Sequence, residues 1–340
     1  MSVFWQLLSR GCQDVKLDIG YNIKDIEKTP NEYNYYPSLY LCNNNIYEIP
    51  KCFTDFINLE NFYLSRNKIS NLPKFLKNLI NLKTLKLSHN EIKTIPYFMN
   101  YLGKLQELDL SNNKLEIIPK SICHTENLKR LVLNNNKIQK IPYYFCYLTN
   151  LRDLRLRNNC IKFIDNSFGY LLNLRYLELS TNKLKIIPEC LYNLTNLEDL
   201  FLDNNEIKYI SSNINNLINL RILALRHNKL PDILSVKNLV KLENLHISFN
   251  KLENLPISIT NLTELKILQI DGNNIVNLHI IIQRFIKRQI CLVTCWNLQQ
   301  YLTSNETNNI YNDKQNIHTS SIQSSVRKSI INILSTELNI

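Results

Sequence analysis

Five side chains in the second half of the sequence have the types that proton transfer or metal binding requires. The carboxylates Glu178, Asp199 and Asp203 could form an acidic patch, and paired carboxylates can act as a general acid and base. His227 and His246 are imidazoles that could approach one another, as zinc ligands do. No enclosing pocket is predicted around the carboxylates and the histidines have no third ligand. The pattern therefore predicts neither a catalytic site nor a metal site.

The cysteines do not form a recognisable site either. Cys291 and Cys295 are spaced as C-x3-C, but there is no second cysteine pair to complete a zinc site. An edge strand within the segment ICLVTCW, residues 290–296, is the favoured interpretation. The chain contains no GxxxxGK[ST], GxGxxG, GxSxG or HExxH motif and only five glycines, which leaves little room for a phosphate-binding loop. We therefore expect no enzymatic activity and no cofactor.

The composition predicts the cellular compartment of the protein and the charge of its partners. The nine cysteines are odd in number and scattered, which is typical of a reducing compartment, and the first residues lack the pattern of a secretory signal. No run approaches the roughly 18 apolar residues of a membrane span. We expect a cytoplasmic protein, with a nuclear location as the alternative. Forty Lys and Arg against 29 Asp and Glu give a net charge of +11, which favours acidic partners.

From residue 36 onward the sequence repeats itself, and every step but one is 23 residues long. The consensus is LxxLxLxxNxIxxIPxxFxxLxx, and the eleven copies begin at Tyr36, Leu59, Leu82, Leu105, Leu128, Leu151, Leu174, Leu197, Leu220, Leu242 and Leu265. The asparagine at position 9 occurs in every copy, from Asn44 to Asn273. An array of this kind folds as one elongated unit, because a single repeat cannot bury its apolar face alone.

Each part of the repeat has a predicted structural role. The LxL segment alternates apolar and polar residues, which predicts a half-buried strand. Proline at position 15, as in Pro119, fixes φ and ends the extended run. The asparagine lies where the chain leaves the strand, so its amide can pair backbone groups that would otherwise be buried without partners.

This pattern resembles the leucine-rich repeat family over roughly residues 36–287, in the 23-residue form of intracellular Ras-scaffold and Scribble/Erbin-type repeats. The resemblance implies an α/β fold: a curved leucine-rich repeat solenoid with a concave parallel β-sheet, about eleven full repeats and a degenerate N-terminal one. The expected organisation is an N-terminal cap with the degenerate repeat at 1–35 and the solenoid at 36–287. A C-terminal cap and mobile tail at 288–340 follow, with a short amphipathic helix in VRKSIINILSTEL.

Residues at repeat positions 3, 5 and 7 should face the concave surface, because alternate residues of a strand point to opposite faces. Arginines gather in repeats five and six, and aromatic and apolar residues follow in repeats seven to nine, which is what a binding surface needs. The predicted partner-binding residues are Arg130, Arg152, Arg155, Arg157, Tyr176, Glu178, Asp199, Phe201, Asp203, Ile222 and Arg226. As the alternative, the arginines pair with Asp153 or Glu178 along the sheet.

Lysines form a second column away from the sheet. They occupy position 10 (Lys68, Lys114, Lys137, Lys183, Lys229, Lys251) and position 12 (Lys93, Lys162, Lys185, Lys208). A solvated rim that keeps the array soluble is the favoured interpretation. Contact with phosphates or an anionic surface is the alternative.

The predicted function is a non-catalytic scaffold that binds a protein partner, with an acidic segment, through the concave face. A regulatory subunit of a phosphatase or small-GTPase pathway is the alternative, which rests on resemblance to leucine-rich regulators of both. A third hypothesis, an RNA-associated factor, is the least favoured, because aromatic residues are sparse among the lysines.

Overall fold

The computed structural model of the protein describes residues 14–16, 37–276 and 292–294. All of them belong to the first of two compact units, residues 1–295 and 296–340. The C-terminal helix expected in VRKSIINILSTEL lies outside the described residues, as do Cys291 and Cys295.

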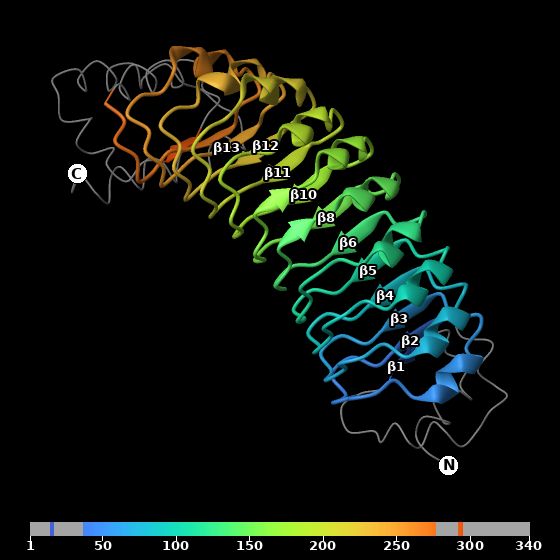
Figure 1. The fold of residues 1–340 in the computed structure, drawn as a ribbon. Coiled ribbons are helices and arrows are strands. Elements are labelled where there is room, and N and C mark those ends of the chain that lie inside the picture. The colour runs from blue at the N-terminus through green and yellow to red at the C-terminus, as the bar shows by residue number, and fades with distance from the viewer. Residues whose placement is uncertain (1–13, 17–36, 277–291, 295–340) are drawn as a thin grey trace, which may run out of the picture. The chain divides into compact units, whose positions relative to one another are not determined.

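Short parallel strands, one per repeat, form a 13-stranded sheet in which they lie side by side in chain order (Figure 1). The strands are β1 (Asp14–Lys16), β2 (Ser38–Tyr40), β3 (Asn61–Tyr63), β4 (Thr84–Lys86), β5 (Glu107–Asp109), β6 (Arg130–Val132), β8 (Asp153–Arg155), β10 (Tyr176–Glu178), β11 (Asp199–Phe201), β12 (Ile222–Ala224), β13 (Asn244–His246), β14 (Ile267–Gln269) and β15 (Leu292–Thr294). β1 pairs with β2, and β15, which lies within ICLVTCW, pairs with β14.

The register places equal repeat positions next to each other. Arg155 of β8 pairs with Val132 of β6 on one side and with Glu178 of β10 on the other. The shorter step between Leu220 and Leu242 leaves this register intact, since Ile222 pairs with Asn244. The columns expected at positions 3 and 5 are therefore confirmed.

In repeats one to ten, the opposite side of the coil is a five-residue 3₁₀ helix rather than an α-helix. These helices are η3 (Lys51–Asp55), η4 (Lys74–Asn78), η5 (Tyr97–Tyr101), η6 (Lys120–His124), η7 (Tyr143–Tyr147), η8 (Asn166–Tyr170), η9 (Glu189–Asn193), η10 (Ser212–Asn216), η11 (Leu234–Asn238) and η12 (Ile257–Asn261). Proline precedes seven of them. Where Asp165 and Ser211 replace it, the side chain caps the helix by accepting a hydrogen bond from the amide two residues later.

A second, two-stranded parallel sheet lies between strand and helix in repeats five and six. It consists of β7 (Lys140–Ile141) and β9 (Phe163–Ile164), with Lys140 opposite Phe163. Ile141 and Ile164 are buried, whereas Lys140 and Phe163 are exposed. This small sheet orders one edge of the coils.

The core consists of the repeated leucines and isoleucines, and the asparagines link one coil to the next. In repeat six, the Asn159 amide nitrogen donates to the carbonyls of Leu133 and Leu156, each at 3.0 Å. Its oxygen accepts from the Ile138 amide at 3.0 Å, and the side chain is only 6% exposed. Asn159 thus satisfies three buried backbone groups, and a buried group left without a partner costs about 1–3 kcal/mol. The predicted solenoid with its concave parallel sheet is confirmed.

Candidate partner-binding surface

A chain of side-chain contacts runs across the middle of the concave sheet. Arg130 on β6 brings its Nε to 3.4 Å from Glu107 Oε1 and 3.3 Å from Asp153 Oδ2. Lys86 on β4 extends the chain by pairing with Glu107. On β8, Arg155 donates from Nε and Nη2 to the two oxygens of Asp153, at 2.9 and 3.0 Å. The expected alternative pairing of arginine with Asp153 is therefore present.

The contact chain continues into an aromatic pair. The Arg155 guanidinium lies 4.5 Å from the ring centre of Tyr176, and this ring is 5.2 Å from that of Phe201 on β11. The hydrogen bonds that Arg155 donates to Asp153 raise the pKa of Arg155 above its usual value, so the cation is retained. Burial raises the pKa of Tyr176, with a further contribution from the charge of Glu178, so its ring stays neutral. These contacts hold a cation and two aromatic rings in fixed positions on a partly exposed surface.

Arg157 differs from its neighbours because it has no such contact. Its side chain is exposed at position 7 of repeat six, and no hydrogen bond or ion pair of its guanidinium occurs among residues 37–276. Within this range Arg157 is bonded only through its backbone, because its amide donates a hydrogen bond to Asn134 Oδ1 at 2.8 Å. We refer to Arg130, Asp153, Arg155, Arg157, Tyr176 and Phe201 as the central patch.

Arg152 lies beside the central patch, in a column of charged residues at repeat position 2 that the sequence interpretation did not single out. Its exposed side chain has Lys129 of repeat five and Arg175 of repeat seven as neighbours in this column. Arg175 is paired with Glu198 at 2.9 Å, whereas Arg152 pairs with no acidic residue in the described part of the solenoid. A tally of charges by repeat position, rather than by strand alternation, would have revealed the column.

Several residues at the concave positions are buried rather than exposed, among them Glu178 and Ala224. Glu178 is only 9% exposed, and its Oε1 accepts a hydrogen bond from the Ser180 amide at 3.0 Å. Ala224 is 1% exposed. Both occupy position 5, where Phe201 of β11 lies beside each of them in the register. The expectation of exposure was wrong for both residues, because a short or folded-back side chain at position 5 is covered by a larger neighbour such as Phe201.

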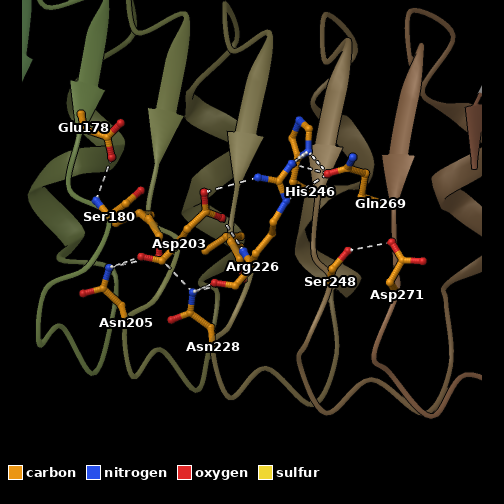
Figure 2. Close-up of polar contacts among 12 residues, drawn as sticks. Glu178, Ser180, Asp203, Asn205, Arg226, Asn228, His246, Ser248, Gln269 and Asp271 are labelled. Atoms are coloured by element: carbon orange, nitrogen blue, oxygen red, sulfur yellow. Dashed lines mark hydrogen bonds and ion pairs between the residues drawn. The ribbon is translucent and has the colours of Figure 1, made fainter. Parts of the chain in front are cut away.

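A polar network occupies the C-terminal part of the same face (Figure 2). Asp203 Oδ1 accepts from the Arg226 amide, at 2.6 Å, and its other oxygen lies 3.9 Å from Arg226 Nη1. Arg226 Nε donates to Gln269 Oε1 at 2.9 Å, and Arg226 Nη2 contacts both Gln269 and His246 Nδ1. We refer to Asp203, Arg226, His246 and Gln269 as the C-terminal network.

Burial dominates the protonation of this network. It raises the pKa of Asp203, against the opposing effect of the Arg226 contacts. Burial also lowers the pKa of His246 below its ordinary 6.5, and the charge of Arg226 acts in the same direction. The predicted site residues Asp203 and Arg226 are therefore bonded to each other, and they are less available to a partner than the sequence suggested.

The remaining predicted residues flank these two regions. Asp199 and Ile222 are adjacent in the register at position 3 and both are partly exposed. Burial raises the pKa of Asp199. Near them, Glu243 accepts from Arg221 and Lys266, each at 2.6 Å, and these two hydrogen bonds lower its pKa to about 2.

The histidines do not meet. His227 stacks on Phe249 with ring centres 4.4 Å apart, whereas His246 belongs to the C-terminal network. No cluster of three His, Cys, Asp or Glu side chains within the described ranges could hold a metal ion. In the same part of the chain, none of the helices is both long and apolar enough to cross a bilayer.

Comparison with known families identifies the repeats. The family model described as leucine rich repeat matches residues 37–92, 58–115, 82–138, 126–184 and 149–207, which together span just over half of the chain. No curated protein sequence matches significantly.

Solved structures with this fold include two bacterial proteins and a plant receptor. An internalin of Listeria monocytogenes is similar with a TM-score of 0.75 and 22% identity, over 89% of this chain and 91% of the other. A leucine-rich repeat protein of Leptospira interrogans has a TM-score of 0.67 and 26% identity, over 82% and 81%. A plant peptide hormone receptor, RGFR1 in complex with RGF2, has a TM-score of 0.60 and 27% identity, and this chain covers 51% of it.

Proposed function

Because the chain belongs to the leucine-rich repeat family, we propose that it is a non-catalytic scaffold whose concave face binds a segment of a protein partner. Proteins of this family generally mediate protein–protein interaction, and the fold provides a long row of strands with exposed side chains. The finer part of the proposal is the place and chemistry of the contact. We assign it to the central patch and to a partner segment that carries acidic and aromatic or apolar side chains.

The observation that carries the proposal is the fixed contact of Arg155 with Tyr176 and of Tyr176 with Phe201. Two partly exposed rings beside a cation offer apolar area with little side-chain entropy to lose on binding. Arg152 and Arg157 add positive charge that no acidic residue in the described solenoid neutralises. A partner carboxylate would accept charge-assisted hydrogen bonds from these guanidinium groups.

One structural relative is a receptor for a peptide. The plant receptor with a TM-score of 0.60 is a peptide hormone receptor in complex with RGF2. A solenoid of this fold can thus have a peptide as its partner, and the present chain offers an ordered cation–aromatic surface for one.

The proposal is tested by selecting peptides from a random 12-residue display library on the full chain. We expect enrichment of peptides that combine Asp or Glu with an aromatic or large apolar residue. The double variant Arg155→Glu with Phe201→Ala should lose this enrichment and bind the selected peptides at least about 100-fold more weakly, because hot-spot truncations of 2 kcal/mol or more are typical of such anchors. Its circular dichroism spectrum should stay that of the folded solenoid, although loss of the Arg155–Asp153 hydrogen bonds should lower its melting temperature.

The matched control is Lys266→Glu with Ile267→Ala in repeat eleven, which makes the same kinds of change at position 2 beside the concave face and at position 3 on it. It should retain binding. Equal enrichment by wild type and the central double variant would contradict the assignment, and so would loss of binding in the control.

Because the repeats resemble those of phosphatase and small-GTPase regulators, both kinds of enzyme are also tested as partners. If a phosphatase is the partner, its activity should co-purify with the full chain and disappear with Arg155→Glu and Phe201→Ala. A panel of GTPases loaded with GDP or GTP is assayed for binding in the same way.

A further inference from the structure

The lysine column expected away from the sheet is joined by large apolar side chains in the structure. At position 13, four such residues are 57–60% exposed: Ile117, Phe163, Ile186 and Tyr209. The last three directly follow a lysine at position 12, whereas Ile117 follows Glu116. The sequence interpretation treated the lysines alone. We refer to Lys137, Lys140, Lys162, Lys183, Lys185 and Lys208, together with these four residues, as the lysine rim.

The backbone of the lysine rim is ordered from coil to coil. The amide of Cys160 donates to Ile138 O at 2.8 Å, and the amide of Lys183 donates to Ile161 O at 2.9 Å. The parallel register of β7 and β9 places Lys140 directly beside Phe163. With about 5 Å between neighbouring strands, the rim residues of repeats four to eight extend over about 20 Å. Lysine ammonium groups and apolar side chains therefore project from one continuous row.

The charge of this row is not balanced locally. All six rim lysines are exposed, and none belongs to an ion pair of the described solenoid. The acidic residues at positions 10–13 of repeats four to eight are Glu116 and Glu206, and Glu206 is paired with Lys229 at 3.1 Å. The rim thus combines a net positive charge with exposed apolar side chains.

Three classes of anionic partner could meet such a rim, and its residue types favour one of them. The cores of protein interfaces are depleted in lysine. Single-stranded nucleic acid needs rings on which bases stack, whereas Ile117 and Ile186 are aliphatic. A bilayer with anionic lipids accepts both kinds of group, since ammonium groups meet the headgroups and aliphatic or aromatic side chains enter the interface.

We propose that the lysine rim docks the protein on an anionic lipid surface, with Phe163, Ile186 and Tyr209 entering the headgroup–acyl boundary. The contact is peripheral, and it uses none of the residues of the central patch. The concave face stays open, so the scaffold could hold its partner at the membrane. This proposal is independent of the partner-binding proposal, because the two surfaces share no residue.

The test is co-sedimentation of the full chain with vesicles of phosphatidylcholine alone or with 30% phosphatidylserine. We expect binding only to the second kind, weakening steeply with salt. Near such a surface each basic residue contributes about fivefold in binding. The triple variant Lys162→Glu, Lys185→Glu and Lys208→Glu should therefore bind more than about 100-fold more weakly.

Two matched controls separate the rim from general charge and apolarity. Lys74→Glu, Lys120→Glu and Lys237→Glu make the same change in net charge on exposed helix residues and should keep most of the binding. Phe163→Ser, Ile186→Ser and Tyr209→Ser should weaken binding at high salt. The triple Tyr97→Ser, Tyr147→Ser and Tyr170→Ser on the helices should not.

Insertion is read from a tryptophan placed at the rim. In Phe163→Trp, vesicles with phosphatidylserine should shift the added emission to shorter wavelength, and brominated lipid should quench it, whereas Tyr170→Trp should show neither change.

The proposal is overturned by absence of binding to both kinds of vesicle, or by equal losses in the rim and control lysine triples. Binding of the full chain to poly-uridylate but not to vesicles would also overturn it. Retention of vesicle binding by Arg155→Glu with Phe201→Ala shows that the two proposals fail or hold separately.

Discussion

Arg157 and Arg226 are the same residue type at the same repeat position, and the structure uses them in opposite ways. Both follow a concave strand at position 7, in repeats six and nine. Arg157 projects from the central patch without a side-chain partner in the described solenoid, whereas Arg226 contacts Asp203, His246 and Gln269. The difference teaches that neighbours decide whether a concave side chain is available to a partner.

The neighbours of these arginines explain the contrast. Asp203 occupies position 7 in the repeat before Arg226. Gln269, two repeats after Arg226, provides an amide oxygen that the guanidinium reaches. On the N-terminal side of Arg157 stands Asn134, a neutral residue that bonds to the Arg157 backbone. The same cation therefore stabilises the solenoid in one region and remains exposed in the other.

The largest expected difference in stability is between the alanine variants of Arg226 and Arg157. Arg226→Ala should lower the free energy of unfolding by about 2 kcal/mol, because Asp203, His246 and Gln269 all lose a charged donor. Arg157→Ala should change it by less than about 0.5 kcal/mol. Urea unfolding of both full-length variants measures the difference. Equal destabilisation would show that the two regions do not differ as described.

A smaller effect is expected from acidification of the C-terminal network. The pKa of His246 is lowered in the folded state, so the unfolded chain binds more protons as the pH falls below 6.5. Stability should therefore decrease from pH 7.5 to pH 5.5. His246→Gln should remove this part of the decrease, since glutamine does not titrate. Urea unfolding of wild type and variant at both pH values tests it, and parallel losses would argue against His246 as the source.

The smallest effect is expected at Glu243, which bridges two exposed cations beside the network. Its folded pKa of about 2 lies below the ordinary 4.5, so its stabilising contribution is present above pH 4.5 and is lost as the pH falls toward 2. Exposed ion pairs contribute little, about 0–1 kcal/mol. Glu243→Gln should slightly flatten the acid limb of the stability profile, with no change in the His246 window. A steeper acid limb in the variant would contradict the pairing.

Much of the fold could be predicted because its signals are local and repeated. The alternation around each LxL segment predicted the strands, and the 23-residue period predicted the register that places Arg155 beside Glu178. The asparagine at position 9 was predicted to satisfy turn backbone groups, as Asn159 does. The return segment was less predictable, since apolar spacing alone does not distinguish a 3₁₀ helix from an α-helix over five residues.

Only part of the candidate site could be predicted from the sequence. Sequence placed Arg155, Tyr176 and Phe201 on one face, and the structure adds that they touch in a chain. It also buries Glu178, which alternation had placed among the exposed residues. The apolar part of the lysine rim at Phe163 was missed, because position 13 is a variable position of the repeat and the sequence interpretation considered only the lysines beside it.

The sequence by itself determined the solenoid, the order of its strands and the identity of every residue in each concave column, because a fixed period makes equal positions adjacent. Only the tertiary structure decided which of those residues are free. Arg226 meets Gln269 across 43 residues and two repeats, and such pairings depend on side-chain length, rotamer and the space left by neighbouring coils. The backbone pattern is local, whereas the choice of partner is not.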